Sequence, residues 1–517
     1  MQQQQGPVDL LIVGGGVNGA GIARDAAGRG LSVLLVEQDD LAAWTSSASS
    51  KLIHGGLRYL EYYEFRLVRE ALIEREVLLA SAPHIIHPLR FVLPHHAGLR
   101  PGWMLRAGLF LYDHLGGRQR LPGARRVDLR ADPTGAALKA DYRRGFEYSD
   151  AAVDDSRLVV LLARDAAERG ARILTRTRLV SARREGDLWQ AVIQRDDGTR
   201  ETVAARAIVN AAGPWVEELQ GLTGVADDGR TVRLVKGSHI VVPRLFDGDH
   251  AYTLQNGDGR VVFAIPYQDR FTLVGTTDIP YQGDPARAQA SAEEIDYLCR
   301  TIADYFEAAP TPADVVWAFS GVRPLFDDGQ NNASAVTRDY VLDLDQDGPP
   351  LLTIYGGKIT TFRRLAEHAL EKLQGPLAFT AGPWTHDAKL PGGEGDLDAL
   401  RRDVAARRPW LPAAVLDRMI HAYGARIDAV LGEAASWADL GRDHGAGLTE
   451  REVCYLVDRE WARDPADILW RRTKLGLHMT PAERDAFLAT AISAPPREGG
   501  DPALRGVEGP APPDRIS

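Results

Sequence analysis

The sequence predicts an α/β fold in which one largely parallel sheet is interleaved with an antiparallel sheet and followed by an all-α C-terminal domain. Three observations support this prediction. A glycine-rich strand–turn–helix–strand pattern opens the chain at 8–37, and a second strand–turn–helix pattern occurs late, at 351–373. Runs with alternating polarity lie between them, and apolar residues at helical spacing fill 397–491. A chain of 517 residues has room for two or three such domains.

The composition excludes several classes of protein. Apolar residues make up 44% of the chain and charged residues 26%, which suits a soluble protein with a large core. Because 71 acidic residues outnumber 61 basic ones, giving a net charge of −10, no nucleic-acid partner is expected. Cys299 and Cys454 form no disulfide or metal-binding pattern, which indicates a reducing cytoplasm. The N-terminus has no signal-peptide pattern and no apolar run approaches the ~18–20 residues of a membrane span, so we expect neither export nor an integral membrane protein.

The opening pattern has the spacing of a dinucleotide-binding turn. An apolar run, Val8–Val13, leads into Gly14-x-Gly16-x-x-Gly19, and a second apolar run ends on Glu37. Gly14 permits the tight turn, Gly16 lets the backbone approach a pyrophosphate, and Gly19 lets the helix pack against the strand. Glu37 lies near the ~20-residue offset of a carboxylate that binds a ribose hydroxyl, and it would repel a 2′-phosphate. The motif therefore predicts FAD or NAD rather than NADP.

The elements that follow are predicted from their polarity patterns in chain order. A Ser-rich loop at 45–50 comes first. An amphipathic helix is expected at 65–80, before Pro83, and a second helix at 154–169. Strands are expected near residue 173 and at 189–193, 207–211, 232–242 and 261–276. The last two suggest an antiparallel sheet that forms the substrate side.

The late glycine turn distinguishes two kinds of dinucleotide-binding protein. A strand at 351–354 leads into Gly356-Gly357-Lys358, and a helix follows at 362–373. NAD domains are usually complete within one contiguous segment, whereas many flavoproteins return late in the chain to close over the flavin. We therefore expect a Rossmann-type FAD-binding domain over 1–390, interleaved with a substrate-binding part. The expected boundaries are 80–150 and 214–350 for the substrate part, 391–493 for the helical C-terminal domain and 494–517 for a disordered tail.

An acidic segment before this turn is similar to the start of a calcium-binding loop. Asp343, Asp345 and Asp347 precede Gly348, yet the twelfth position of the loop is Ile354 rather than a bidentate Glu. An acidic hairpin without a metal ion is therefore predicted.

Motifs spread over most of the chain indicate a known family. They are TSSASSKLIHGGLRYLEYYEFRLVREAL, GFEYSDAAVDDSRLV, NAAGPW, RLVKGSHIVVP, GTTD, SGVRPL, TRDY, YGGKITTFRRLAEHAL and WRRTKLG. From about Asp9 to Gly476 the sequence resembles the FAD-dependent (aerobic, respiratory) glycerol-3-phosphate dehydrogenases, within the D-amino acid oxidase-like flavoproteins. The resemblance implies oxidation of sn-glycerol 3-phosphate to dihydroxyacetone phosphate, with electrons passed to a membrane quinone (ubiquinone or menaquinone). It also allows a homodimer.

The resemblance points to the residues of the site. Arg323, in SGVRPL, is the expected phosphate clamp, since a guanidinium fork matches phosphate oxygens. Arg58 and Tyr59 are expected at the substrate or at the flavin edge. His239 is a candidate general base because imidazole titrates near neutral pH, and Lys358 is expected to stabilise negative charge on the reduced flavin or to contact substrate. Which of His239, Lys358 and Arg58 takes the proton stays open at this point.

The expected cofactor contacts come from the two glycine turns, the Ser-rich loop and the glycine of NAAGPW. They are Gly14, Gly16, Asn18, Gly19, Glu37, Thr45, Ser46, Ser47, Lys51, Leu52, Gly213, Gly357, Lys358 and Thr360.

One segment bears on membrane association. Leu99–Leu115 mixes aromatic and apolar residues with Arg100 and Arg106, which is typical of a helix lying in a membrane interface and also of a buried helix. Because family members work with a quinone, the resemblance favours peripheral binding at the cytoplasmic face of the inner membrane.

Other functions remain open on the sequence. A related FAD oxidase or dehydrogenase could act on another hydroxy or amino acid, but SGVRPL with Arg323 favours a substrate that bears a phosphate. An NAD-binding dehydrogenase or sensor without flavin would have no use for the late glycine turn. A non-enzymatic interaction protein would leave the basic residues of the expected pocket unexplained.

Overall fold

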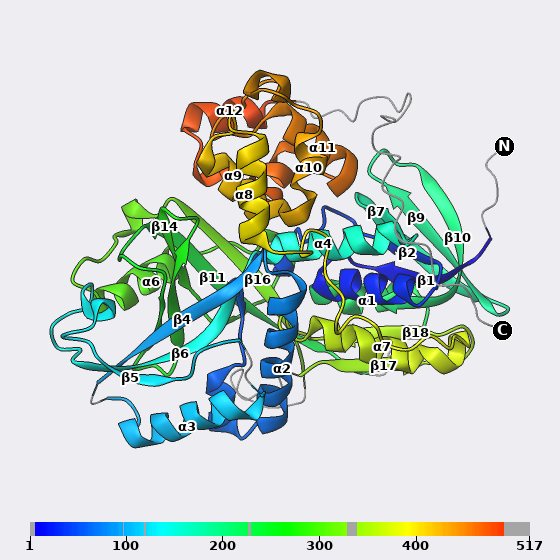
Figure 1. The fold of residues 1–517 in the computed structure, drawn as a ribbon. Helices are drawn as coiled ribbons and strands as arrows, with labels where there is room; N and C mark the ends of the chain where they lie inside the picture. The colour runs from blue at the N-terminus through cyan, green and yellow to red at the C-terminus, as the bar shows by residue number, and fades with distance from the viewer. Residues whose placement is uncertain (1–5, 97, 118–119, 226–228, 328–338, 491–517) are drawn as a thin grey trace, which may run out of the picture.

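The computed structural model describes residues 6–96, 98–117, 120–225, 229–327 and 339–490. Figure 1 shows two sheets side by side, with a group of helices above the region where they meet. The predicted α/β class with an all-α C-terminal part is confirmed. The tail expected to be disordered from 494 onward lies outside the described residues.

The first sheet is mainly parallel and begins with the opening glycine turn. Its strand order is β17-β18-β10-β1-β2-β7, and the antiparallel strands β8 and β9 extend from β10. The strands are β1 Val8–Val13, β2 Val33–Val36, β7 Arg172–Leu174, β8 Thr177–Glu185, β9 Leu188–Arg195, β10 Arg200–Asn210, β17 Val341–Asp345 and β18 Leu351–Tyr355. Three helices, α1 Val17–Gly28, α4 Asp155–Glu168 and α7 Phe362–Leu377, share one apolar core with this sheet (Figure 1).

The chain does return late to this sheet. Strand β18 pairs in parallel with β10, and α7 then packs on α1. Phe362 at the start of α7 lies so close that a Cβ built on Gly21 of α1 would be 2.8 Å from its ring. The acidic segment forms an antiparallel hairpin with β18, so β17 lies in the first sheet and not in the substrate part where the sequence placed it.

The second sheet is mainly antiparallel and stands on the substrate side. Its order is β15-β11-β14-β13-β12-β4-β6-β3, with β16 paired to β11 and β5 paired to β6. The strands are β3 Leu52–Ile53, β4 Ile86–His95, β5 Arg125–Asp128, β6 Arg144–Val153, β11 Val232–Pro243, β12 Ala251–Gln255, β13 Val261–Tyr267, β14 Phe271–Gly275, β15 Ile279–Pro280 and β16 Trp317–Phe326. Helix α6, Ala292–Tyr305, covers part of it and contacts β11 and β13.

Two differences from the sequence prediction concern this sheet. The run predicted as one strand at 261–276 is the hairpin β13–β14, because Gln268 and Asp269 adopt positive φ and reverse the chain. Strands β3, β4, β5, β6, β12, β15 and β16 were not predicted. β4 includes Pro88 and Pro94, which weaken any strand signal, and β16 is held by its pairing with β11 rather than by its own pattern.

Two helices flank the junction of the sheets. α2, Phe65–Ser81, matches the prediction at 65–80 and runs down between the two sheets, and α3, Gly102–Leu115, lies at the lower edge of the molecule in Figure 1. None of the described helices is both long enough and apolar enough to cross a bilayer.

The C-terminal part has its own apolar core. It comprises α8 Leu397–Arg407, α9 Ala413–Tyr423, α10 Ile427–Leu431, α11 Glu450–Glu460, a π-helix at Asp467–Arg472 and α12 Pro481–Leu488. Met419, Ile427, Leu431, Leu456 and Ile468 are fully buried in that core.

Candidate active site

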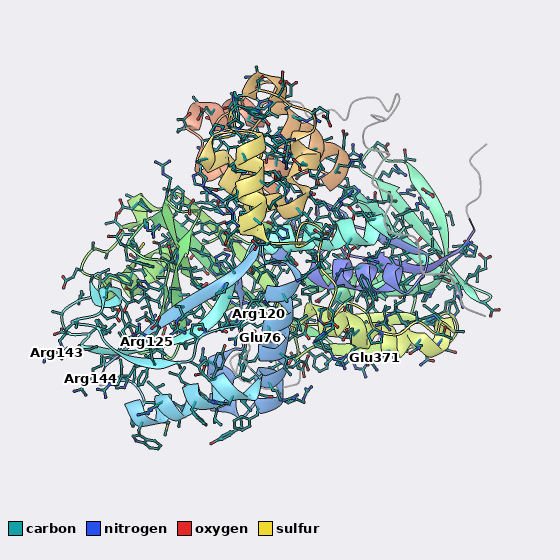
Figure 2. The ribbon with its side chains drawn as sticks, viewed as in Figure 1. Glu76, Arg120, Arg125, Arg143, Arg144 and Glu371 are labelled. Atoms are coloured by element: carbon teal, nitrogen blue, oxygen red, sulfur yellow. The ribbon has the colours of Figure 1, made fainter. Side chains whose placement is uncertain are left out.

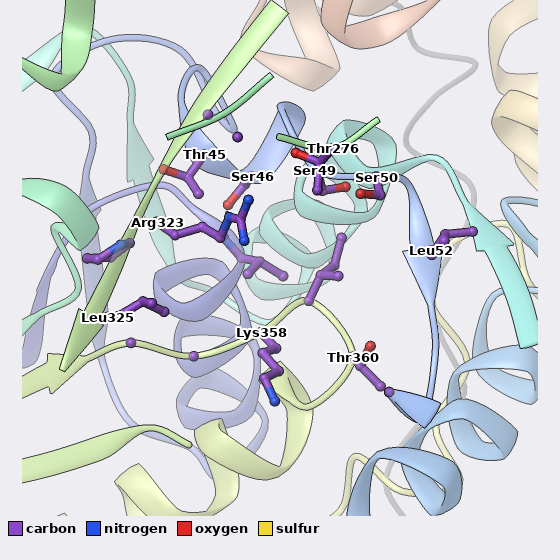
Figure 3. Close-up of a pocket in the computed structure, with 18 of the residues that line it drawn as sticks. Thr45, Ser46, Ser49, Ser50, Leu52, Thr276, Arg323, Leu325, Lys358 and Thr360 are labelled. Carbon is purple, nitrogen blue, oxygen red and sulfur yellow. The ribbon is translucent and has the colours of Figure 1, made fainter. Parts of the chain in front are cut away.

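A cavity of about 920 Å³ lies between the two sheets. Its walls come from the carboxyl ends of β1, β10 and β18 on one side and from β11, β13 and β16 on the other. Ligands in α/β proteins bind at this end of parallel strands, so the position is the expected one. Figure 3 shows a close-up of this region, with Thr45, Ser46, Arg323 and Lys358 among the labelled side chains.

One end of the cavity is formed by the opening glycine turn. Gly14 and Gly16 line it at the N-terminus of α1. A Cβ on Gly14 would lie 2.4 Å from the carbonyl oxygen of Ala211, and one on Gly19 would lie 1.9 Å from that of Gly14. Gly19 does not line the cavity, so its part is to let α1 pack against the turn. A helix N-terminus with bare backbone in front of it suits a pyrophosphate.

Glu37 lies beside this turn and is buried. Its carboxylate accepts hydrogen bonds from the backbone N–H groups of Gly15 (2.6 Å) and Asp39 (2.8 Å). Burial raises the pKa of Glu37 to about 7, although these two backbone hydrogen bonds act in the opposite direction.

The second glycine turn meets the first across the cavity. Asn18 Nδ2 of α1 donates to the carbonyl oxygen of Gly356 at 3.2 Å, and a Cβ on Gly357 would lie 2.6 Å from the same nitrogen. Both glycines have positive φ (78° and 101°). Asn18 Oδ1 is buried and has no hydrogen-bond partner among the described residues, which leaves an acceptor for a bound group. Asn18, Gly357, Lys358 and Thr360 all line the cavity.

The Ser-rich loop closes the cavity between its two ends. Ser46 Oγ accepts from the backbone N–H of Val17 at 3.0 Å, and Thr45 Oγ1 donates to the carbonyl oxygen of Val322 at 2.7 Å. Thr45, Ser46 and Leu52 line the cavity, as does Gly213 in the turn that follows β10.

Three residues predicted to contact the cofactor do not line the cavity: Gly19, Ser47 and Lys51. The Lys51 ammonium donates to both carboxylate oxygens of Asp155 and to the carbonyl oxygen of Ser47, each at 2.9 Å. Both side chains are buried, so Lys51 ties the Ser-rich loop to the start of α4; its predicted contact with the cofactor stays a prediction.

His239 of β11 lies at the substrate end, where its ring is stacked on Phe319 (centroids 5.1 Å apart). Its Nε2 is 2.9 Å from Ser50 Oγ. Burial lowers the pKa of His239 well below 6.5, and the charges of Lys51 and Arg323 lower it further. The imidazole is therefore neutral at physiological pH.

Three of the predicted cationic side chains line the cavity as well. Arg323 of β16 is half-buried; its Nη1 lies 3.3 Å from Asp278 Oδ1 and its Nη2 donates to the carbonyl oxygen of Thr277 at 3.1 Å. The Lys358 ammonium lies over the ring of Tyr59, 4.2 Å from its centroid. Arg58 lines the cavity beside Tyr59. Figure 3 shows Lys358 on the loop that follows β18, with its ammonium directed away from Arg323.

The sequence did not single out several of the residues that line this end. Ser50, Thr276, Asp278 and Gln255 are among them. Ser50 lies in the Ser-rich loop, and Thr276 and Asp278 lie in GTTD. Both motifs were recognised as family matches, but a motif alone does not show which of its residues will lie near His239 in the fold.

Two glycine turns, far apart in the sequence, close over one cavity, and an antiparallel sheet forms its other wall. This arrangement defines a flavin-dependent oxidoreductase. The chain belongs to the FAD-dependent oxidoreductases and, within them, to the glycerol-3-phosphate dehydrogenase family. The family model described as FAD dependent oxidoreductase matches residues 9–363, and the model for the C-terminal domain of alpha-glycerophosphate oxidase matches residues 383–493.

Relatives and solved structures agree with this assignment. The chain is 56% identical to a glycerol-3-phosphate dehydrogenase of Pseudomonas aeruginosa, over 92% of this chain and 93% of the relative. It is 55% identical to a D-erythritol 1-phosphate dehydrogenase of Brucella abortus, over 93% and 97%. The crystal structure of the Bacillus halodurans glycerol-3-phosphate dehydrogenase complexed with FAD superposes with a TM-score of 0.74 at 26% identity and covers 94% of both chains. FAD is thus the cofactor, and the predicted cofactor and enzyme class are confirmed.

Proposed function

We propose that this enzyme oxidises sn-glycerol 3-phosphate to dihydroxyacetone phosphate and passes the electrons to a membrane quinone. The observation that carries the proposal is that a neutral imidazole and three cationic side chains line the same cavity. A secondary alcohol that bears a phosphate needs both: a base for its hydroxyl proton and cations for its phosphate.

Each side chain has a part in this proposal. Arg323 and Lys358 bind the phosphate, and Asp278 holds the guanidinium of Arg323 in place. His239 takes the hydroxyl proton at Nε2, the nitrogen that Ser50 Oγ contacts. Tyr59 and Arg58 close the substrate end. Bound FAD supplies a two-electron acceptor for the hydride of the carbinol carbon.

A second candidate substrate follows from the relatives. The D-erythritol 1-phosphate dehydrogenase is as similar to this chain as the glycerol-3-phosphate dehydrogenases are. Both substrate names describe a polyol with a terminal phosphate, so the cationic side chains of the cavity suit either, and the length of the polyol is the point to be tested.

An apolar branch of the cavity supports the quinone part of the proposal. It extends from Leu57 and Leu60 to α3, where Met104, Leu105 and Leu111 line it. Such walls suit an apolar acceptor better than a charged one.

The outer face of α3 supports peripheral membrane binding. Trp103 is 71% exposed, Phe110 62% and the nearby Tyr63 79%, so large apolar side chains gather at one surface. Figure 2 shows Arg125, Arg143 and Arg144 on the neighbouring β5–β6 edge, where cations would meet anionic lipid headgroups. We propose that this surface lies on the cytoplasmic face of the inner membrane.

The test is the visible absorption spectrum under anaerobic conditions. Glycerol 3-phosphate is expected to bleach the flavin bands, as two-electron reduction requires. Erythritol 1-phosphate, unphosphorylated glycerol, a 2-hydroxy acid and an amino acid are added in parallel. Bleaching by the last two but not by the phosphates would contradict the proposal, and faster bleaching by erythritol 1-phosphate would move it to the longer polyol.

A further inference from the structure

One short segment of the C-terminal part, Trp470–Lys474 within WRRTKLG, reaches the back of the active site. It includes the end of the π-helix and makes three separate contacts with the oxidoreductase part, residues 9–363. The sequence and the proposed chemistry assign none of these contacts a role.

The first contact is with the start of the flavin loop, defined here as residues 39–51. Arg472 is fully buried and donates to both carboxylate oxygens of Asp40, at 2.8 and 2.7 Å. Arg471 donates to the same carboxylate at 2.6 Å. Burial alone would raise the pKa of Asp40, but the two guanidinium groups outweigh burial and lower it. Asp40 therefore remains a carboxylate held by two cations of the C-terminal part.

The second contact is with the support of the same loop. The buried Lys474 ammonium donates to Asp154 at 2.8 Å and also contacts Ser156 Oγ, which donates to the carbonyl oxygen of Arg471 at 2.8 Å. Asp155, between these residues, binds Lys51 and accepts from Ser49 Oγ at 2.8 Å. Lys474 thus fixes the turn of α4 that anchors the other end of the flavin loop.

The third contact is an aromatic stack that ends on His239. Trp470 stacks on Trp317 (centroids 5.0 Å, planes 26° apart), and Trp317 packs on Phe319 at 4.8 Å. Phe319 stacks on the His239 ring. Gly476 makes room for Trp470, since a Cβ there would lie 2.7 Å from the indole.

We infer that Trp470–Lys474 is a positioning element of the active site: Arg471, Arg472 and Lys474 hold the flavin loop at both ends, and Trp470 fixes the ring of His239. The residues act through others and contact no reacting group. The part that concerns His239 rests on the proposed function, whereas the part that concerns the flavin loop does not.

The flavin loop is tested in the purified holoenzyme through FAD affinity. Arg471→Met removes one of the two cations on Asp40, and retention of FAD on ultrafiltration is expected to fall, with a dissociation constant roughly 10-fold higher. Arg401→Met is the matched control, because Arg401 pairs with Asp417 on the surface of the C-terminal part. Arg471→Lys keeps the charge and is expected to restore part of the FAD affinity. The role of this charge can therefore be tested even if Arg471→Met folds poorly.

The stack is tested through the pH profile of flavin reduction by glycerol 3-phosphate. Trp470→Leu is expected to slow reduction roughly 10–100-fold and to shift its pH dependence, while Trp470→Phe restores both. Trp461→Leu is the control, since Trp461 packs against Arg164 of α4 at the same interface but away from the stack. Wild-type FAD affinity in Arg471→Met together with a wild-type profile in Trp470→Leu would overturn the inference. Equal losses in Trp470→Leu and Trp461→Leu would overturn it as well. If no polyol phosphate reduces the flavin, the proposed function fails. The FAD affinity of the Arg471 variants still tests whether this segment positions the flavin loop.

Discussion

The two ends of the cavity use glycine for different purposes. At two glycines of the opening turn the missing side chains would collide with backbone: 2.4 Å from Ala211 O at Gly14 and 1.9 Å from Gly14 O at Gly19. At the substrate end they would collide with functional side chains: 2.3 Å from Arg323 Nη2 at Gly237 and 2.1 Å from His239 Cδ2 at Gly275. A backbone collision cannot be relieved by a change of rotamer, so glycine shapes the fold at one end and sets the positions of reactive groups at the other.

The largest effect is expected at the cofactor end. Gly19→Ala places a methyl group inside the contact between α1 and the opening turn, so we expect little folded holoprotein and no bound FAD. The flavin absorbance per protein and the melting temperature measure this. Normal flavin content in this variant would show that the turn is more compliant than its geometry indicates. Gly375→Ala in α7, where a Cβ meets no atom within 4 Å, controls for a methyl group added to a helical glycine.

At the substrate end, removal of the imidazole should leave the fold intact. His239→Gln is expected to slow flavin reduction roughly 10²–10⁴-fold, the range for loss of a general base, with FAD content unchanged. Stopped-flow bleaching at 450 nm, roughly the flavin band, measures the rate. A rate within a factor of about two of the wild type would exclude His239 as the base.

A smaller effect is expected when Arg323 is displaced but retained. Gly237→Ala pushes the guanidinium from its position, so the KM for glycerol 3-phosphate should rise roughly 10-fold through weaker charge-assisted hydrogen bonds. Steady-state kinetics give KM and kcat separately. A fall in kcat with unchanged KM would mean that Arg323 serves the reacting centre and not the phosphate.

In the apoprotein, the stability contributions of a residue at each end of the cavity should change with pH in opposite directions. The pKa of His239 is lowered, so below pH 6.5 the unfolded chain binds a proton that the folded protein does not, and stability falls with falling pH. The pKa of Glu37 is raised from 4.5 to about 7, so its contribution is present below pH 4.5 and is lost as the pH rises through about 7. Each slope is at most about 1.4 kcal/mol per pH unit. Urea unfolding of His239→Gln and Glu37→Gln against pH should show opposite differences from the wild type; differences of the same sign would contradict this.

The apolar branch of the cavity lies apart from both ends. Substitutions on the exposed face of α3 beside it should therefore affect flavin reduction least. Phe110→Glu or Trp103→Glu on α3 should release the enzyme from vesicles of phosphatidylethanolamine and phosphatidylglycerol without changing flavin reduction or melting temperature. Leu488→Glu is the control, since Leu488 is also exposed (41%) but lies in α12, far along the chain from α3. Unchanged vesicle binding in the α3 variants would exclude this surface.

The sequence predicted the cofactor end better than the substrate end, and the glycines explain why. Gly14, Gly16 and Glu37 form a local pattern whose spacing is set by one turn and one helix, so it can be recognised without the fold. The contact of Ser50 with His239 depends on the pairing of strands far apart in sequence. The ion pair of Lys51 with Asp155 was not predicted for the same reason, since only the fold brings these two residues together.

The hydrogen bond between Asn18 and Gly356 joins residues 338 positions apart, which has a consequence during synthesis. At about 5–20 residues per second, the ribosome needs roughly 20–70 s to complete the second glycine turn after the first has emerged. Through that interval the nascent chain has half of a cofactor site and an unfinished sheet whose β10 edge awaits β18. The complete FAD site, with both glycine turns, can therefore form only after the second turn has been made.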